Sequence, residues 1–192
     1  MPLAKPAPRK HLHSRNIECK GYEREDGLWD IEGRITDTKT YSFSNIDRGE
    51  VGAGTPVHDM LIRLTVDNDL VVHEAEATTE SAPFNICPVI TDGVKALKGL
   101  KIASGWTRNV QKAIGGLKGC THINQLITGP LATTAYQSIV PRKHHKKDKD
   151  ITNSKEKPTK RPVVIDTCHA FAADGANVQR FWPDFYEGKN ES

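Results

Sequence analysis

The chain has 192 residues, of which 36% are hydrophobic and 27% charged, and its formal net charge is +3. This length suits one domain, and enough apolar residues are present for a single core. No apolar run approaches the roughly 18 residues that span a bilayer, and the start of the chain lacks the apolar stretch of a secretion signal. We therefore expect a cytoplasmic protein without a membrane partner.

The basic charge is concentrated in one segment. Residues 142–161 hold nine Lys or Arg against three Asp or Glu, a net charge of +6, so the rest of the chain carries −3. A surface that binds nucleic acid needs its positive charge on a folded face. This segment has almost no apolar residues, so we predict a disordered lysine-rich insertion and no nucleic-acid partner. Docking of the segment on an acidic partner protein is a separate hypothesis.

The first part of the chain predicts an extended arm followed by a β-hairpin. Residues 1–15 form the predicted arm. Strand-like segments at 17–22 and 28–35 then flank Asp26-Gly27, and an Asp-Gly turn between alternating segments is a strong hairpin signal.

A second hairpin is predicted after a glycine-rich loop over 41–56. Segments 60–66 and 70–77 alternate between apolar and polar residues, and three consecutive turn-forming residues join them. Such alternation is typical of a sheet with one buried face.

Beyond the second hairpin the apolar residues recur at helical spacing. Pro88 can open a helix at its first turn, a second short helix covers 105–114, and Thr121 can cap a third. Gly129-Pro130 should break or kink that third helix.

A last predicted helix follows the apolar residues 163–165. The order of a sheet first and helices afterwards favours an α+β fold. We expect a single domain over 16–186, interrupted by the insertion at 142–161.

Three of the four cysteines, Cys87, Cys120 and Cys168, lie at predicted helix starts. Unpaired backbone N–H groups and the helix dipole favour a thiolate at such a position. A capped helix with a simply buried thiol is the alternative. Without an export signal, metal ligation, catalysis and burial all stay open. The candidate metal ligands are Cys87, Cys120, His122 and Cys168, although their spacing matches no C-x-x-C knuckle.

Residues that suit acid–base chemistry stand near the starts of the two hairpins. His58 and Asp59 are adjacent, and an imidazole with an orienting carboxylate can act as a general base. A solvated turn is the alternative for this pair. His13 and Arg15 precede the first strand, and the Arg15 guanidinium can bind a carboxylate or a phenolate.

Several motifs resemble those of a bacterial family known only as a domain of unknown function. The resemblance spans about residues 10–186 apart from the insertion. Its motifs are Ile17-Glu18-Cys19, the stretch from Arg24 to Gly33, Thr36 to Lys39, Pro56 to Met60, Gly119 to His122, Gly129 to Ala135, and Asp166 to Ala170. Some members are similar to lyases that release the hydroxymethyl carbon of lignin-derived aromatic dimers as formaldehyde.

That resemblance implies a cofactor-independent lyase whose substrate is a phenolic dimer of the phenylcoumaran or diarylpropane type. His58 and His122 would be the bases, Asp59 would orient an imidazole, and Arg15 would hold the phenolate. The remaining expected substrate-binding residues are Tyr22 and Trp29, which can stack on the rings, together with His13 and His169.

A fainter resemblance is to iron–sulfur scaffold proteins of the NifU type. It implies that this chain has the layout of the NifU and SufE folds. In this comparison His58-Asp59 stands where those proteins have Cys-Gly-Asp, and Cys87 occupies the second ligand position. Cys120 and His122 occupy the third. His58 replaces a cysteine, so the resemblance implies zinc or an iron–sulfur cluster as the alternative to a cofactor-free enzyme. A homo-oligomer is compatible with either function.

Overall fold

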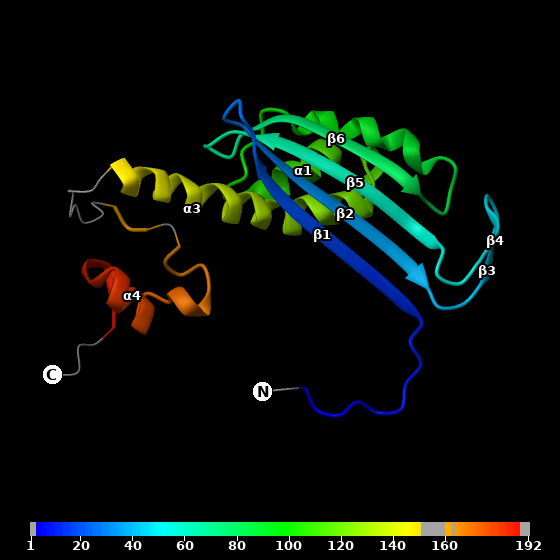
Figure 1. Ribbon diagram of the computed structural model, residues 1–192, viewed down its shortest axis with the longest axis horizontal. Coiled ribbons are helices and arrows are strands. Elements are labelled where there is room, and N and C mark those ends of the chain that lie inside the picture. The colour runs from blue at the N-terminus through cyan, green and yellow to red at the C-terminus, as the bar shows by residue number, and fades with distance from the viewer. Residues whose placement is uncertain (1–2, 151–159, 163, 189–192) are drawn as a thin grey trace. The chain divides into compact units, whose positions relative to one another are not determined.

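The computed structural model describes residues 3–150, 160–162 and 164–188, and the chain divides into two compact units (Figure 1). The units span residues 1–149 and 150–192, and each has a hydrophobic core of its own. The second core forms because the apolar residues of 165–186 pack among themselves, and the single domain over 16–186 stays a prediction.

The first unit is built on a four-stranded antiparallel sheet with the order β1-β2-β5-β6. Both predicted hairpins are present, and their strands are longer than expected. A two-stranded hairpin lies within the predicted loop. The strands are β1 (His13–Glu23), β2 (Trp29–Lys39), β3 (Phe43–Asn45), β4 (Gly49–Val51), β5 (Pro56–Val66) and β6 (Val72–Ser81).

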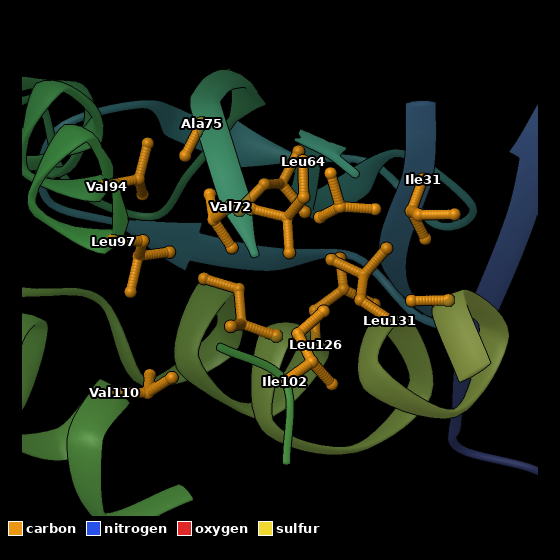
Figure 2. Packing of buried hydrophobic residues seen from close by; sticks show 14 of the residues in the cluster. Ile31, Leu64, Val72, Ala75, Val94, Leu97, Ile102, Val110, Leu126 and Leu131 are labelled. Atoms are coloured by element: carbon orange, nitrogen blue, oxygen red, sulfur yellow. The ribbon is translucent and has the colours of Figure 1, made fainter. Parts of the chain in front are cut away.

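One face of this sheet is buried under helices, as the alternation of apolar residues predicted (Figure 2). Inward positions of β2 and β5 supply fully buried side chains such as Ile31, Ile35, Met60 and Leu64. The sheet followed by helices confirms the α+β fold class. No described helix is long and apolar enough to cross a membrane.

The helical layer follows the sheet in the chain. Trp106 anchors this layer, since its indole N–H donates to the carbonyl of Ile127 at 3.1 Å. The elements are η1 (Cys87–Leu97), α1 (Trp106–Ile114), η2 (Gly116–Lys118), α2 (Thr121–Leu126), η3 (Ile127–Leu131) and α3 (Ala132–Asp150).

At Gly129-Pro130, where a break or kink was predicted, the helix changes type and then continues. Pro130 lies in η3, a π-helical turn that connects α2 directly to α3. A π turn accommodates a residue that cannot donate the usual backbone hydrogen bond and whose ring would crowd the preceding turn.

The beginning of the lysine-rich segment is helical and not disordered. α3 continues through Pro141 to Asp150, whereas residues 151–159 lie outside the described part of the chain. Lys and Arg have good helix propensity, and extending an existing helix avoids the cost of a new nucleus.

In its described residues, the second unit holds three short helical elements in place of one predicted helix. A turn closed by the bond from the Gly175 N–H to the Ala172 carbonyl separates the first two. Ile165, Ala173 and Val178 form the buried core of this unit. The elements are η4 (His169–Phe171), α4 (Ala176–Phe181) and η5 (Pro183–Phe185).

Candidate functional site

A buried aspartate, Asp37, lies at the centre of a polar cluster at one end of the sheet. It continues the inward-facing positions of β2 after Ile31 and Ile35, and it is only 2% exposed. The strand register places Asp37 between Arg15 on β1 and His58 on β5. Directly opposed residues in antiparallel strands share a face of the sheet, so these three side chains meet.

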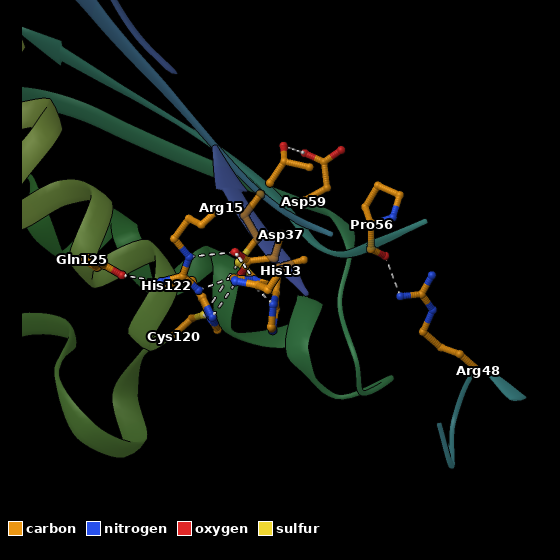
Figure 3. Close-up of polar contacts among 12 residues, drawn as sticks. His13, Arg15, Asp37, Arg48, Pro56, Asp59, Cys120, His122 and Gln125 are labelled. Carbon is orange, nitrogen blue, oxygen red and sulfur yellow. Dashed lines mark hydrogen bonds and ion pairs between the residues drawn. The ribbon is translucent and has the colours of Figure 1, made fainter. Parts of the chain in front are cut away.

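Basic groups surround the Asp37 carboxylate (Figure 3). Arg15 donates from Nε and Nη2 to its two oxygens, each at 2.7 Å, in a bidentate pair. Nδ1 of His58 lies 3.0 Å from Oδ2, and Nε2 of His13 lies 3.2 Å from Oδ1. Since an ionised carboxylate only accepts hydrogen bonds, Asp37 fixes the orientation of the groups around it.

The helical layer adds His122 to this cluster through α2. The rings of His122 and His58 are stacked with centroids 3.8 Å apart and planes inclined by 32°. Cys120, the residue before α2, has Sγ 3.8 Å from His122 Nδ1. Gln125, one turn further, accepts a hydrogen bond from Arg15 Nη1 at 2.9 Å. The helix therefore joins the guanidinium and the imidazoles in one site.

Burial and charge shift the titration of these groups. Desolvation is the largest influence on the pKa of His58 and lowers it, although the adjacent Asp37 acts in the opposite direction. Desolvation also lowers the pKa of His122, assisted by the charge that His58 carries when it is protonated and by the permanent charge of Arg15. For Asp37, burial alone would raise the pKa, but the hydrogen bonds and charge of Arg15 outweigh it and the pKa is lowered.

These shifts define the protonation states near pH 7. Asp37 is an anion, whereas His58 and His122 are neutral. If Nδ1 of His58 donates its proton to Asp37, the lone pair of Nε2 is left to accept a proton from a ligand. The cluster thus has the parts of a general base, an orienting carboxylate and a fixed cation.

The predicted partnership between His58 and Asp59 is wrong. Asp59 is held by Arg34, whose Nε donates to Oδ1 at 2.7 Å, and by the hydroxyl of Thr36. Adjacent residues of a strand point to opposite faces of the sheet, so Asp59 faces away from His58. Asp37 occupies the orienting position instead.

The two aromatic residues expected to bind substrate lie far from the cluster. Trp29 is buried in the core, and its indole N–H donates to Asn68. Tyr22 is half-exposed near the opposite end of β1, seven positions from Arg15, which corresponds to roughly 23 Å along a strand. Contrary to the prediction, these two rings therefore do not lie where they could stack on a ligand beside His58.

The predicted cysteine cluster is not assembled in the part of the chain that the structure describes. Asp37, His58 and His122 form the one group of three or more potential ligands there, with ligand atoms within 4.8 Å of one another. Cys87 begins η1 outside this group. Cys168 is exposed and, like His169, belongs to the second unit. Of the expected ligands in the first unit, Cys120 and His122 are in contact, with Sγ 3.8 Å from Nδ1.

Asp37 is the functional residue that sequence reasoning missed. The signal was present, since every second residue from Trp29 to Ile35 faces the core and the next inward position is Asp37. A carboxylate at an inward position is costly to bury unless it is paired. A count of polar residues along the inward face would have selected Asp37, and the same count along β5 selects His58.

The cluster lies in the part of the chain that matches a known protein family. Residues 13–137 match the family described as "Protein of unknown function (DUF2889)", and this region contains every residue of the cluster from His13 to Gln125. No curated protein and no solved structure matches the chain. The NifU-like layout therefore stays a prediction. The chain belongs to the DUF2889 family, and the sheet and the cluster lie within the part that defines its membership.

Proposed function

We propose that this protein is a lyase that acts on phenolic aromatic dimers of the phenylcoumaran or diarylpropane type and releases their hydroxymethyl carbon as formaldehyde. The observation that carries the proposal is the contact of 3.0 Å between His58 Nδ1 and the buried carboxylate of Asp37. A neutral imidazole oriented in this way is suited to remove protons near neutral pH. We expect the reaction to take place in the cytoplasm.

The chemistry needs two proton transfers. In the first, a base takes the phenolic proton, and the electron pair moves through the ring and expels the benzylic oxygen to give a quinone methide. In the second, a base takes the hydroxyl proton of the CH₂OH group. The carbon–oxygen double bond of formaldehyde then forms and the carbon–carbon bond breaks. Its electron pair forms a new carbon–carbon double bond at the benzylic carbon, and the electrons of the quinone methide return to the ring to restore the aromatic phenolate.

The proton and electron balance requires no cofactor. The two protons return to the expelled oxygen and to the phenolate, and no oxidant or reductant is consumed. His58 and His122 supply the two bases, and Asp37 takes the orienting role that we first expected of Asp59. Arg15 stabilises the phenolate, since its guanidinium carries five N–H donors and the three contacts described above use only three of them.

The test is release of formaldehyde from a phenolic phenylcoumaran by the purified full chain. We expect His58→Gln and Asp37→Asn to lower kcat by roughly 100-fold or more, the usual contribution of a general base. Asp59→Asn is the matched control, since it removes a carboxylate from the adjacent position on the opposite face, and its rate should be unchanged.

A second control uses the substrate. The same dimer with its phenol methylated cannot lose the first proton, so it should release no formaldehyde. The proposed function would be refuted if the wild-type protein left both the phenolic phenylcoumaran and the phenolic diarylpropane intact. Full activity in His58→Gln would refute the assignment of the base.

A divalent metal site is the second candidate, favoured by the ligand atoms of Asp37, His58 and His122 within 4.8 Å of one another. Two imidazoles and a carboxylate are a common ligand set for zinc and ferrous iron. Arg15 opposes this function because its bidentate pair already uses both Asp37 oxygens.

Isothermal titration calorimetry of the metal-free protein with zinc tests the metal site. One equivalent bound in the wild type and lost in His122→Gln would support it. Unchanged binding in that variant, or none in the wild type, would remove it.

A further inference from the structure

The strand β1 forms one edge of the sheet, and this edge is long and regular (Figure 1). β1 pairs with β2 over eleven consecutive residues without a bulge, and it contains no proline. The opposite edge, β6, is partly covered, because Val72 exchanges hydrogen bonds with Gly99 and Leu100. β1 is thus the edge best suited to accept another strand.

The hydrogen bonds of the first hairpin show which backbone groups of β1 face outward. The Arg24 N–H donates to the Leu28 carbonyl, and the Thr40 N–H donates to the Leu12 carbonyl. In an antiparallel pair the bonded positions recur at every second residue. Even-numbered residues of β1 therefore bond to β2, whereas Arg15, Ile17, Cys19, Gly21 and Glu23 direct their N–H and C=O groups away from the sheet.

Among the described residues, no backbone hydrogen bond given for the turns and loops uses the outward groups of Arg15, Ile17, Cys19 or Gly21. Natural edge strands are usually protected by proline, bulges or charged residues that discourage pairing. Here the exposed side chains of the edge include the large apolar residues Ile17 and Tyr22. β1 also carries the exposed charges of Glu18 and Lys20, so an apolar strand is a poor partner and a strand of complementary charge can pair with it.

We propose that β1 pairs with β1 of a second copy of this chain, in an antiparallel register in which Cys19 faces Cys19 of the partner subunit. Charge complementarity selects this occupant and this register. Glu18 then lies opposite the partner's Lys20, and Lys20 lies opposite the partner's Glu18. Both side chains are exposed and already form an ion pair within one strand at 3.0 Å, so they remain on the same face of the sheet.

The registers centred on Ile17, Glu18 and Lys20 are less favourable. Centring the two-fold axis on Glu18 or on Lys20 would place like charges directly opposite each other, which destabilises a strand pair. Centring it on Ile17 would leave Glu18 opposite Asn16 and would lose both charge pairs. The register centred on Cys19 also uses the outward backbone groups, since Cys19 is one of the positions that direct them away from the sheet.

The dimer joins the two sheets into one continuous sheet of eight strands. It also changes the surroundings of the candidate site. The partner's Glu23 lies opposite Arg15 on the face that carries the cluster, because directly opposed residues share a face. The Glu23 carboxylate, which accepts a hydrogen bond from Arg142 Nε at 3.0 Å within its own chain, is therefore brought near the guanidinium that holds Asp37.

Sedimentation equilibrium on the full chain over a range of concentrations tests the proposal. We expect a species of twice the 21.3 kDa chain mass that dissociates on dilution. Glu18→Lys and Lys20→Glu should each raise the dimer Kd by roughly tenfold, because each creates two like-charge contacts across the axis. The double variant E18K/K20E exchanges the charges and should recover the wild-type Kd.

A backbone variant tests strand pairing separately from charge. Ile17→Pro removes an outward N–H that β2 does not use, so it should abolish the dimer while the fold is retained, as proline is tolerated on the free side of an edge strand. Ile17→Val keeps the N–H and is the matched control. Circular dichroism melting curves check that both variants fold.

Amide hydrogen exchange distinguishes the second copy from other occupants of the edge. The amides of Ile17, Cys19 and Gly21 should be protected only at concentrations at which the dimer forms. Protection that persists in the monomer would show that another segment of the same chain covers β1, and a chain that is monomeric at every concentration would equally overturn the proposal. The outcome is independent of lyase activity.

Discussion

Replacing Asp37 with asparagine removes the negative charge at the centre of the cluster while keeping nearly the same shape. The carboxylate side chain is 3% exposed and is paired with Arg15, whose side chain is 33% exposed. Loss of one partner from a buried ion pair costs about 3–5 kcal/mol, whereas exposed pairs contribute under about 1 kcal/mol. Because the Arg15 side chain is one-third exposed, the loss should lie between these limits. We therefore expect Asp37→Asn to lower the free energy of unfolding by about 2 kcal/mol at pH 7.

Urea unfolding measures this loss. For a slope of about 2 kcal/mol per molar urea, the transition midpoint should fall by roughly 1 M. The two units complicate a single transition, so the experiment is best made in a Trp182→Phe background. The remaining tryptophans, Trp29 and Trp106, both lie in the core of the first unit and report its unfolding.

The pH dependence follows from the direction of the shift. The pKa of Asp37 is lower in the folded chain than its unfolded value of about 3.9. Its stabilising contribution is therefore complete above that unfolded value and is lost as the pH falls through the folded pKa. The difference between wild type and Asp37→Asn should be full at pH 7 and should narrow below about pH 4.

Asp59→Asn is again the matched control. Asp59 pairs with Arg34, whose side chain is 51% exposed, so its replacement should cost about 1 kcal/mol or less. An unchanged midpoint in Asp37→Asn at pH 7, or an equal loss in Asp59→Asn, would refute the view that Asp37 is the buried electrostatic centre.

Three further results are expected. The pKa values of His58 and His122 are lowered in the folded chain. The free energy of unfolding should therefore fall as the pH drops from about 6.5 through these lowered values. Replacing both histidines with glutamine should flatten this pH dependence, as measured by urea titrations at several pH values. Gly21→Ala should reduce thermal stability by roughly 1–3 kcal/mol, because a Cβ there would lie 2.1 Å from the Ser138 hydroxyl oxygen. Ser138→Gly should restore much of this loss in the same melting assay. Trp29→Phe should reduce stability and leave formaldehyde release unchanged, since this side chain belongs to the core.

Local patterns in the sequence were sufficient for the sheet and for its buried face. The alternation over residues 60–66 placed Met60, Ile62, Leu64 and Val66 in the core, and the Asp-Gly turn defined the first hairpin. Such features depend on neighbours in the chain, since side chains of a strand alternate between faces and particular turns demand particular residues. The same alternation also separates His58 from Asp59, and the adjacency of the two in sequence misled the prediction.

The tertiary structure alone decided which polar residues meet. Arg15, Asp37 and His58 come from three strands and His122 comes from a helix, so their meeting depends on strand order, register and helix docking. Periodicity shows which face a residue occupies but not which strand lies beside it. The cysteines at helix starts looked equivalent in the sequence, yet within the first unit Cys120 lies beside the cluster, because α2 carries His122 to the polar end of the sheet.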